Sequence, residues 1–200
     1  MVAGHGPGPG FRPPATRASP EPPYILYVSE FDPRKGFRQA FEVISTLAAR
    51  GHPHRLKVAG RVAPWVEAEV NSLRQSTSHP ERVDLLGYVP HASLPPIYQS
   101  AAAVVMTNRD EGFGLPAIEA MACGTPLVAF ANGSLAEVIG AGGELVPDGD
   151  VASMADRLEA ILGDSTAWSR LSARGLRRAA DFSWQRSAEI HAEMFRLVAA

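Results

Sequence analysis

Short apolar runs alternate along this chain with longer stretches in which apolar residues recur at the spacing of a helix. The first longer stretch carries Phe37, Phe41, Ile44 and Leu47 at this spacing and ends at Gly51, a common end of a helix. The short runs are bounded by polar, proline or glycine residues, which is typical of buried strands. They predict strands at residues 24–28, 56–59, 83–86, 102–106, 127–130 and 145–146.

Further helices are predicted between and after these strands. The pattern places them at residues 65–73, 94–100, 135–139, 150–162, 165–180 and 184–198, and one more follows Pro116. Because apolar strands alternate with helices, the pattern predicts an α/β fold with a doubly wound parallel sheet, similar to a Rossmann fold. Ligands bind such sheets at the carboxyl ends of the strands, so functional residues are expected in the loops that follow them.

Residues 1–23 lack this alternation and are rich in proline, glycine and alanine. We expect a linker or a loosely packed segment there, because such composition offers few side chains for a core. The predicted domain therefore covers residues 24–200, and the whole chain of 200 residues has the size of one domain.

Composition excludes several classes of function. The net charge of -2 gives no electrostatic reason to expect nucleic acid as a partner. No apolar run approaches the roughly 20 residues of a transmembrane span, and the first residues lack the regions of a signal peptide. A single cysteine, Cys123, excludes an internal disulfide and fits a reducing cytoplasm, so we expect a cytoplasmic protein.

The strongest candidate site is the turn between the strand at 102–106 and the helix that contains Pro116. Proline suits the first turn of a helix, and the free backbone N–H groups there lie at the positive end of the helix dipole, where anions bind. Glu111 and Glu119 flank this turn and could accept hydrogen bonds from sugar hydroxyls. A phosphate site beside sugar-binding carboxylates indicates a nucleotide sugar. The residues of the turn are Gly112, Phe113, Gly114 and Leu115.

This motif resembles the signature of retaining glycosyltransferase family four. Eight positions separate Glu111 from Glu119, Gly-Phe-Gly-Leu-Pro follows the first glutamate, and Ala-Met-Ala-Cys-Gly-Thr-Pro follows the second. The likeness extends from about Tyr24 to the C-terminus. It implies the C-terminal, donor-binding half of a GT-B enzyme, with residues 1–23 at the interdomain hinge and the acceptor-binding N-terminal half missing.

The resemblance also implies an activity. The full enzyme would transfer a hexosyl unit from a nucleoside diphosphate sugar to an acceptor hydroxyl, with no metal or other cofactor, in the cytoplasm or at the membrane surface. Glu111 would lie near the donor sugar as a catalytic residue, and Glu119 would accept from the ribose hydroxyls.

The loop after the first strand departs in part from the family pattern. Lys35 matches the lysine that holds the donor diphosphate, and we expect it to be catalytic. Glu30 stands where an arginine is usual and reverses the charge. Arg34 or Arg61 could compensate, although each is equally well explained as a surface residue. The run from Pro33 to Lys35 resembles mannosyltransferases and favours GDP-mannose, with a UDP-sugar as the other option.

The loop after the third strand resembles the family's base-binding loop. Its residues are Gly87, Tyr88 and Val89. The alternative is a turn with one packed aromatic ring. Asp148 and Asp150 mimic a metal-binding Asp-x-Asp pair, but their position before a helix predicts that Asp150 caps it. Trp184 begins the last helix and is expected either in the core, which we favour, or on an interdomain surface.

Three other functions remain open. A chain without its partner half could be a non-catalytic module that binds nucleotide sugars. Another GT-B enzyme, such as a nucleotide-sugar epimerase, would not be expected to carry Gly-Phe-Gly-Leu-Pro between the glutamates. A dinucleotide-binding domain would need Gly-x-Gly-x-x-Gly after the first strand, and residues 29–36 lack it.

Overall fold

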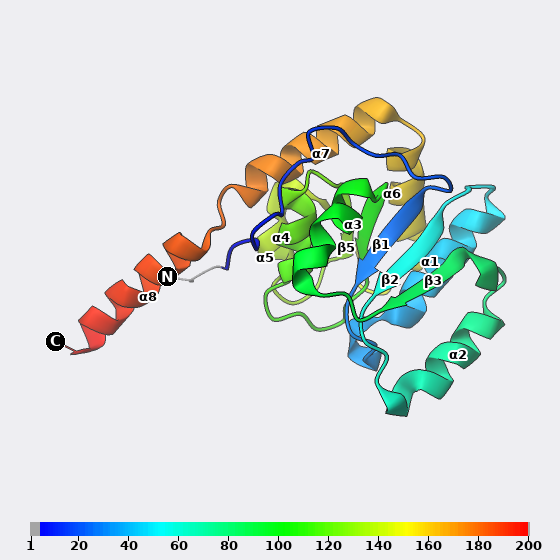
Figure 1. Ribbon diagram of the computed structural model, residues 1–200, viewed down its shortest axis with the longest axis horizontal. Coiled ribbons are helices and arrows are strands. Elements are labelled where there is room, and N and C mark those ends of the chain that lie inside the picture. The colour runs from blue at the N-terminus through cyan, green and yellow to red at the C-terminus, as the bar shows by residue number, and fades with distance from the viewer. Residues whose placement is uncertain (1–4, 200) are drawn as a thin grey trace.

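The computed structural model describes residues 5–199, and its strands form one six-stranded parallel sheet (Figure 1). Neighbouring strands follow the order β3-β2-β1-β4-β5-β6, which confirms the predicted doubly wound fold. The strands are β1 (Tyr24–Val28), β2 (Arg55–Ala59), β3 (Val83–Gly87), β4 (Ala103–Met106), β5 (Leu127–Phe130) and β6 (Glu144–Val146).

Helices cover both faces of this sheet. Ile25 and Tyr27 of β1 point into a core shared with α1, α2 and α6. Tyr24 and Leu26 point the opposite way, as alternate residues of a strand do, into a core shared with α3, α4 and α5. The helices are α1 (Phe37–Ala49), α2 (Glu67–Ser76), α3 (Leu94–Ser100), α4 (Leu115–Ala122), α5 (Leu135–Ile139), α6 (Val151–Leu162), α7 (Ser165–Ala179) and α8 (Trp184–Ala199).

Every predicted strand and helix is present, and most bounds match the prediction to within one residue. The helix predicted at residues 65–73 differs most. A 3-10 turn, Pro64–Val66, comes first, and α2 begins at Glu67. Trp65 is therefore not part of the helix, and its side chain is 84% exposed.

The N-terminal segment, residues 5–23, contains no helix or strand but packs closely on the domain (Figure 1). Phe11 is buried in the core on the α3 and α4 side of the sheet. The Gln99 side chain donates to the carbonyl of Arg12 at 2.8 Å. The Arg17 guanidinium lies 4.1 Å from the centre of the Trp168 ring and donates to the carbonyl of Ala101. The segment is therefore attached to the same body as the sheet.

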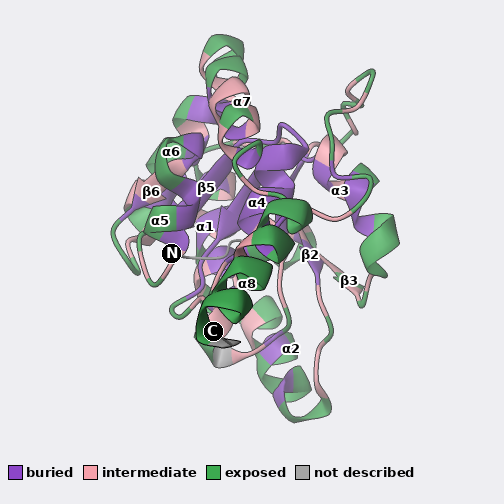
Figure 2. Ribbon diagram, turned by 90° about the vertical axis from the view of Figure 1, so that its left-hand side faces the viewer, coloured by how far each residue is buried: buried purple, intermediate pink, exposed green. Residues whose placement is uncertain are grey.

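The last helix, α8, extends away from the body and is mostly exposed (Figures 1 and 2). Trp184 is 50% exposed, so the expectation that it packs in the core was wrong. Gly6 crosses the start of α8, where a Cβ on Gly6 would lie 2.5 Å from the Trp184 backbone nitrogen. In the described part of the chain, every helix is too short or too polar to span a membrane.

Candidate functional site

The site lies where the strand order reverses, between β1 and β4. The loops after these strands meet because α1 and α4 leave towards opposite faces of the sheet. The Thr107 hydroxyl donates to the Gly36 carbonyl at 2.7 Å, and the Arg109 N–H donates to the Arg34 carbonyl at 2.9 Å. Gly36 has a φ of 71°, and a Cβ there would lie 1.9 Å from the Thr107 carbonyl oxygen. This close approach requires glycine.

Two predicted residues, Lys35 and Glu111, meet directly where these two loops come together. The distance between Lys35 Nζ and Glu111 Oε2 is 3.0 Å. Asn108 also donates to Glu111 Oε2, at 2.7 Å. The buried Tyr27 hydroxyl donates to the Lys35 carbonyl at 2.7 Å, which fixes the backbone from which the lysine extends. The structure thus brings a cation and a carboxylate together in half-buried positions.

The loop after β5 holds the backbone of Glu111. Its carbonyl accepts from the Ser134 hydroxyl at 3.0 Å and from the Ser134 N–H at 3.3 Å. Asn132 donates to the Asn108 carbonyl and, at 3.0 Å, to Asp148 Oδ1. Three loops, those after β1, β4 and β5, therefore position the Lys35–Glu111 pair.

The predicted glycine-rich turn leads into α4 as expected. Gly114 precedes the helix with φ 85° and ψ 50°, a left-handed conformation that favours glycine. A Cβ on Gly114 would lie 2.6 Å from Leu135 Cδ2, so the turn packs tightly on α5. Pro116 lies in the first turn, where the helix N–H groups have no acceptor within the helix. This arrangement offers an anion site next to Glu111.

Glu119 lies in a separate and more enclosed environment. Its Oε1 is 2.8 Å from His91 Nε2, and its Oε2 accepts from the Tyr98 hydroxyl at 3.0 Å. The residue is only 4% exposed, so the alternative of an exposed helical glutamate was wrong. Burial raises the pKa of Glu119, while the hydrogen bonds from His91 and Tyr98 act in the opposite direction. Burial also raises the pKa of Cys123 to about 12, which fits a packing residue.

The two candidate arginines are held by carboxylates of nearby loops. The Arg34 guanidinium makes two hydrogen bonds to Asp32, at 2.8 and 3.0 Å, and the Arg34 backbone N–H donates a third at 2.8 Å. These bonds lower the pKa of the Asp32 carboxyl to about 2. Arg61 is 3.0 Å from Glu30, and both side chains are largely exposed. Neither arginine contacts Lys35 or Glu111 in the described hydrogen bonds.

The loop that resembles a base-binding loop borders a small hollow. Tyr88 is 74% exposed, so the alternative of a packed aromatic was wrong. The ring borders a space of about 170 Å³ together with Arg61, Val89 and Leu94, among others. The loops after β1, β2 and β3 all contribute to this hollow.

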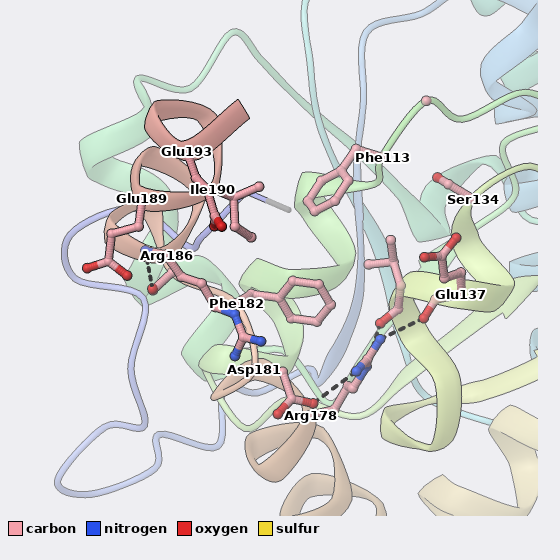
Figure 3. A pocket seen from close by; sticks show the side chains of 13 residues that line it. Phe113, Ser134, Glu137, Arg178, Asp181, Phe182, Arg186, Glu189, Ile190 and Glu193 are labelled. Atoms are coloured by element: carbon pink, nitrogen blue, oxygen red, sulfur yellow. Dashed lines mark hydrogen bonds and ion pairs between the residues drawn. The ribbon is translucent and has the colours of Figure 1, made fainter. Parts of the chain in front are cut away.

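A larger hollow of about 820 Å³ borders the glycine-rich turn at Gly112 and Phe113 (Figure 3). Phe113, Ser134, Phe182 and Ile190 help to line it, and α8 forms one wall. Phe113 contacts the ring of Phe182, with their centres 6.1 Å apart. The lining residues of this hollow do not include Lys35, Glu111 or Glu119, so its size alone does not mark the reactive centre.

Three site residues were not found from the sequence: Asn108, His91 and Tyr98. Asn108 follows β4 directly, which is a position where ligand-binding residues are expected, so it could have been found. His91 follows the loop after β3, at a similar place. Tyr98 lies at a helical core position and gives no local signal.

The Asp-x-Asp pair serves a structural purpose. Asp150 caps α6 by accepting from the Ser153 N–H at 2.9 Å and from its hydroxyl at 2.7 Å. Among the residues that the structure describes, no group of three or more His, Cys, Asp and Glu side chains could hold a metal ion.

Comparisons with known proteins find relatives of this chain in sequence and in structure. The chain is 32% identical to O-antigen chain mannosyltransferase B of Escherichia coli over 162 residues, which cover 81% of the chain and 42% of that enzyme. Sucrose-phosphate synthase from Thermosynechococcus elongatus matches 97% of the chain with a TM-score of 0.79 and 29% identity, over 49% of its own length. HepE from Anabaena, solved with UDP-glucose, shares the fold with a TM-score of 0.77 and 20% identity, over 86% of the chain and 48% of HepE.

The chain thus spans less than half the length of these proteins. The family model described as "Glycosyl transferases group 1" matches residues 12–178, which is most of the chain and includes the Lys35–Glu111 pair, the glycine-rich turn and Glu119. The chain therefore belongs to the glycosyl transferases group 1 family and has the fold of a GT-B glycosyltransferase.

Proposed function

We propose that this chain is the donor-binding domain of a retaining glycosyltransferase that uses a nucleoside diphosphate sugar. The whole enzyme would transfer a hexosyl unit to an acceptor hydroxyl. The observation that carries the proposal is the Lys35–Glu111 pair beside the glycine-rich turn, at the point where the strand order reverses. A cation and free helix N–H groups suit a diphosphate, and a carboxylate suits sugar hydroxyls.

The same groups can assist bond cleavage. As the bond between sugar and phosphate breaks, negative charge grows on the leaving diphosphate. Lys35 and the N–H groups at the start of α4 would stabilise this charge, because they are already fixed in place before the reaction. Tyr27 and Asn108 contribute to this preorganisation through their contacts to the Lys35 backbone and the Glu111 carboxylate.

Glu111 would bind the transferred sugar and need not be a covalent nucleophile. Its ion pair with Lys35 supports a position near the junction of the sugar and the diphosphate. The paired carboxylates of glycoside hydrolases work differently, because both flank the bond that is cleaved. Glu119 lies in its own cluster with His91 and Tyr98, which suits a role at the nucleoside end of the donor.

For the sugar and the base, two observations point in different directions. The related mannosyltransferase and the Pro-Arg-Lys run favour GDP-mannose. The shared fold with HepE, which was solved with UDP-glucose, keeps a UDP-sugar as the second option. The acceptor site would lie in a further domain, because the chain spans less than half of its relatives.

Calorimetric titration with UDP, GDP, ADP and their sugar conjugates tests this proposal. We expect one nucleoside diphosphate and its conjugate to bind to the parent chain and to bind more weakly to Lys35→Ala. The proposal fails if none of these compounds binds, or if the lysine variant binds them as tightly as the parent.

A further inference from the structure

The glycine-rich turn depends on few side chains for its attachment to the domain. Phe113 carries the only side chain between Gly112 and Gly114. Gly114 packs on Leu135, but a Cβ on Gly112 would have no neighbouring atom of the described residues within 4 Å. Because glycine leaves the backbone unusually free, such a turn needs fixed neighbours to stay in one conformation. The contacts of the Phe113 ring therefore help to hold the N–H groups of the turn.

Phe113 lies between two other aromatic rings. The centre of the His5 ring is 4.7 Å from the centre of the Phe113 ring, and the two planes are 84° apart. Phe182 meets Phe113 with 6.1 Å between the ring centres and 83° between the planes (Figure 3). Edge-to-face pairs of this kind are favourable beyond the apolar area that they bury. Phe113 is therefore held by the N-terminal segment and by the connection between α7 and α8.

The Phe182 side of this arrangement is fixed to the domain by α7. The Arg178 guanidinium lies 4.7 Å from the centre of the Phe182 ring. Its Nε donates to the Val138 carbonyl at 2.9 Å, and its Nη2 donates to the Glu137 carbonyl at 2.7 Å. Phe182 thus packs on a side chain that is bonded to the backbone of α5. The contact on the other side of Phe113 comes from His5.

His5 is held in turn by the start of α8. Its ring centre lies 4.9 Å from the centre of the Trp184 ring. The next residue, Gly6, passes so close that a Cβ on it would lie 2.5 Å from the Trp184 nitrogen and 2.7 Å from Ser183 Cα. Among the described residues, the buried Nδ1 of His5 has no hydrogen-bond partner. Ring packing therefore fixes this histidine.

We propose that His5 is a positioning residue for the donor. It packs against Phe113 and thereby keeps the N–H groups of the glycine-rich turn in place for the diphosphate. This inference rests on the proposed function, in which the turn is the anion site. Groups that are fixed before the ligand arrives lose little conformational entropy on binding. The N-terminal segment and α8 meet at this point, so a displacement of either one weakens donor binding.

The rival explanation is that His5 only attaches the N-terminal segment to the domain. Both explanations predict lower stability for His5→Ala, so stability does not separate them. Only the positioning role predicts that the amides of Gly112 and Gly114 become more mobile and that nucleotide binding weakens. His5→Phe separates them further. It keeps a ring against Phe113 but removes both nitrogens, so it should preserve the turn and the binding.

Calorimetric titration with UDP, GDP and ADP measures the binding, and NMR relaxation measures the mobility of the turn amides. We expect His5→Ala to weaken binding of the tightest of these nucleotides about two- to tenfold, the range for one aromatic pair. The order parameters of the Gly112 and Gly114 amides should fall in the same variant. His5→Phe should match the parent in both measurements.

Three further variants test the route of the effect. Phe113→Leu should weaken binding, and His5→Ala should add nothing in its background, because it acts only through the Phe113 ring. Gly6→Ala displaces the segment from α8 without removing a ring and should reproduce part of the His5→Ala effect. His79→Ala is the control. This histidine pairs with Glu81 beside the first residue of β3, at the end of the strand away from the site, and its removal should change neither measurement.

The outcomes separate this inference from the proposed function. If the parent binds none of the three nucleotides, both fail. If Lys35→Ala weakens binding but His5→Ala matches the parent in affinity or in order parameters, only the role of His5 fails. Equal losses in His5→Phe and His5→Ala would also overturn it and would assign the effect to the imidazole nitrogens. So would an undiminished His5→Ala effect in the Phe113→Leu background.

Discussion

Glu111 and Glu119 come from one motif but lie in contrasting surroundings. Glu111 is half-buried and faces a lysine and an amide, 3.0 and 2.7 Å from the same oxygen. Glu119 is fully enclosed, and its partners are an imidazole and a phenol. The glycine-rich turn and the first turn of α4 separate the two carboxylates.

This difference leads us to propose that the short motif serves two ends of one ligand. In the Lys35–Glu111 pair, the lysine can exchange its carboxylate partner for a phosphate, and the carboxylate can exchange its lysine partner for a sugar hydroxyl. The buried Glu119 carboxylate has a pKa that burial raises, and it acts as a fixed support. We infer that Glu111 belongs to the reacting end of the donor and the Glu119 cluster to the nucleoside end.

The largest expected effect concerns the backbone that brings Lys35 to Glu111. Gly36→Ala places a Cβ in a left-handed conformation and against the Thr107 carbonyl oxygen. We expect a loss of about 3 kcal/mol or more in the free energy of unfolding, measured by denaturant titration. Gly51→Ala is the control, since Gly51 has a φ of 87° but open space around it, and should cost only about 1–2 kcal/mol. Equal losses in both variants would contradict the close approach of the two loops.

The second prediction separates the reacting end from the rest of the site. Lys35→Ala should weaken binding of a nucleoside diphosphate by about 1.5–3 kcal/mol in calorimetry, the range for hydrogen bonds to charged groups. Thermal stability should change little, because the Lys35–Glu111 pair is partly exposed. Arg34→Ala should leave binding unchanged, because Asp32 already holds that guanidinium. A larger loss for the arginine variant than for the lysine variant would reverse the assignment.

The third prediction concerns the pH dependence of stability at the enclosed glutamate. Because burial raises the pKa of Glu119 above its ordinary 4.5, the folded protein keeps this proton after the unfolded chain has released it. Ionisation of Glu119 therefore lowers stability as the pH rises from 4.5 to the raised pKa, and the cost is complete above that value. The stability of Glu119→Gln relative to the parent should increase across this window.

Asp150→Asn provides a control of opposite sign. Hydrogen bonds from Ser153 lower the pKa of Asp150 below its ordinary 3.8, so its contribution to stability is present above that value and is lost at lower pH. The stability of Asp150→Asn relative to the parent should therefore decrease as the pH rises. Urea unfolding at several pH values measures both differences, and parallel trends in the two variants would contradict the enclosed state of Glu119.

The two halves of the site differ in how far the sequence could predict them. Lys35, Glu111 and the turn between Glu111 and Pro116 could be predicted because they follow strands and form a contiguous motif. The fold could be predicted for a similar reason, since apolar strands and helical spacing are local patterns. The enclosure of Glu119 could not, because it depends on two segments that are distant from Glu119 in sequence, one with Phe11 and one with His91 and Tyr98.

The N-terminal segment illustrates the same limit. Its proline-rich composition predicts weak packing, yet Phe11 is buried and Arg17 stacks on Trp168. A segment without periodicity can still be fixed by single side chains that fit pockets of the domain. Such fits depend on tertiary geometry and leave no repeating pattern in the sequence.

The central claim is that the two glutamates serve opposite ends of one donor. Calorimetric titration of Glu111→Gln and Glu119→Gln with a nucleoside diphosphate and with its sugar conjugate tests this claim most directly. Glu111→Gln should bind the plain nucleotide as tightly as the parent or more tightly, because Lys35 loses a competing carboxylate, and should bind the conjugate more weakly. Glu119→Gln should weaken binding of both ligands by the same factor. Identical profiles for the two variants would contradict the claim.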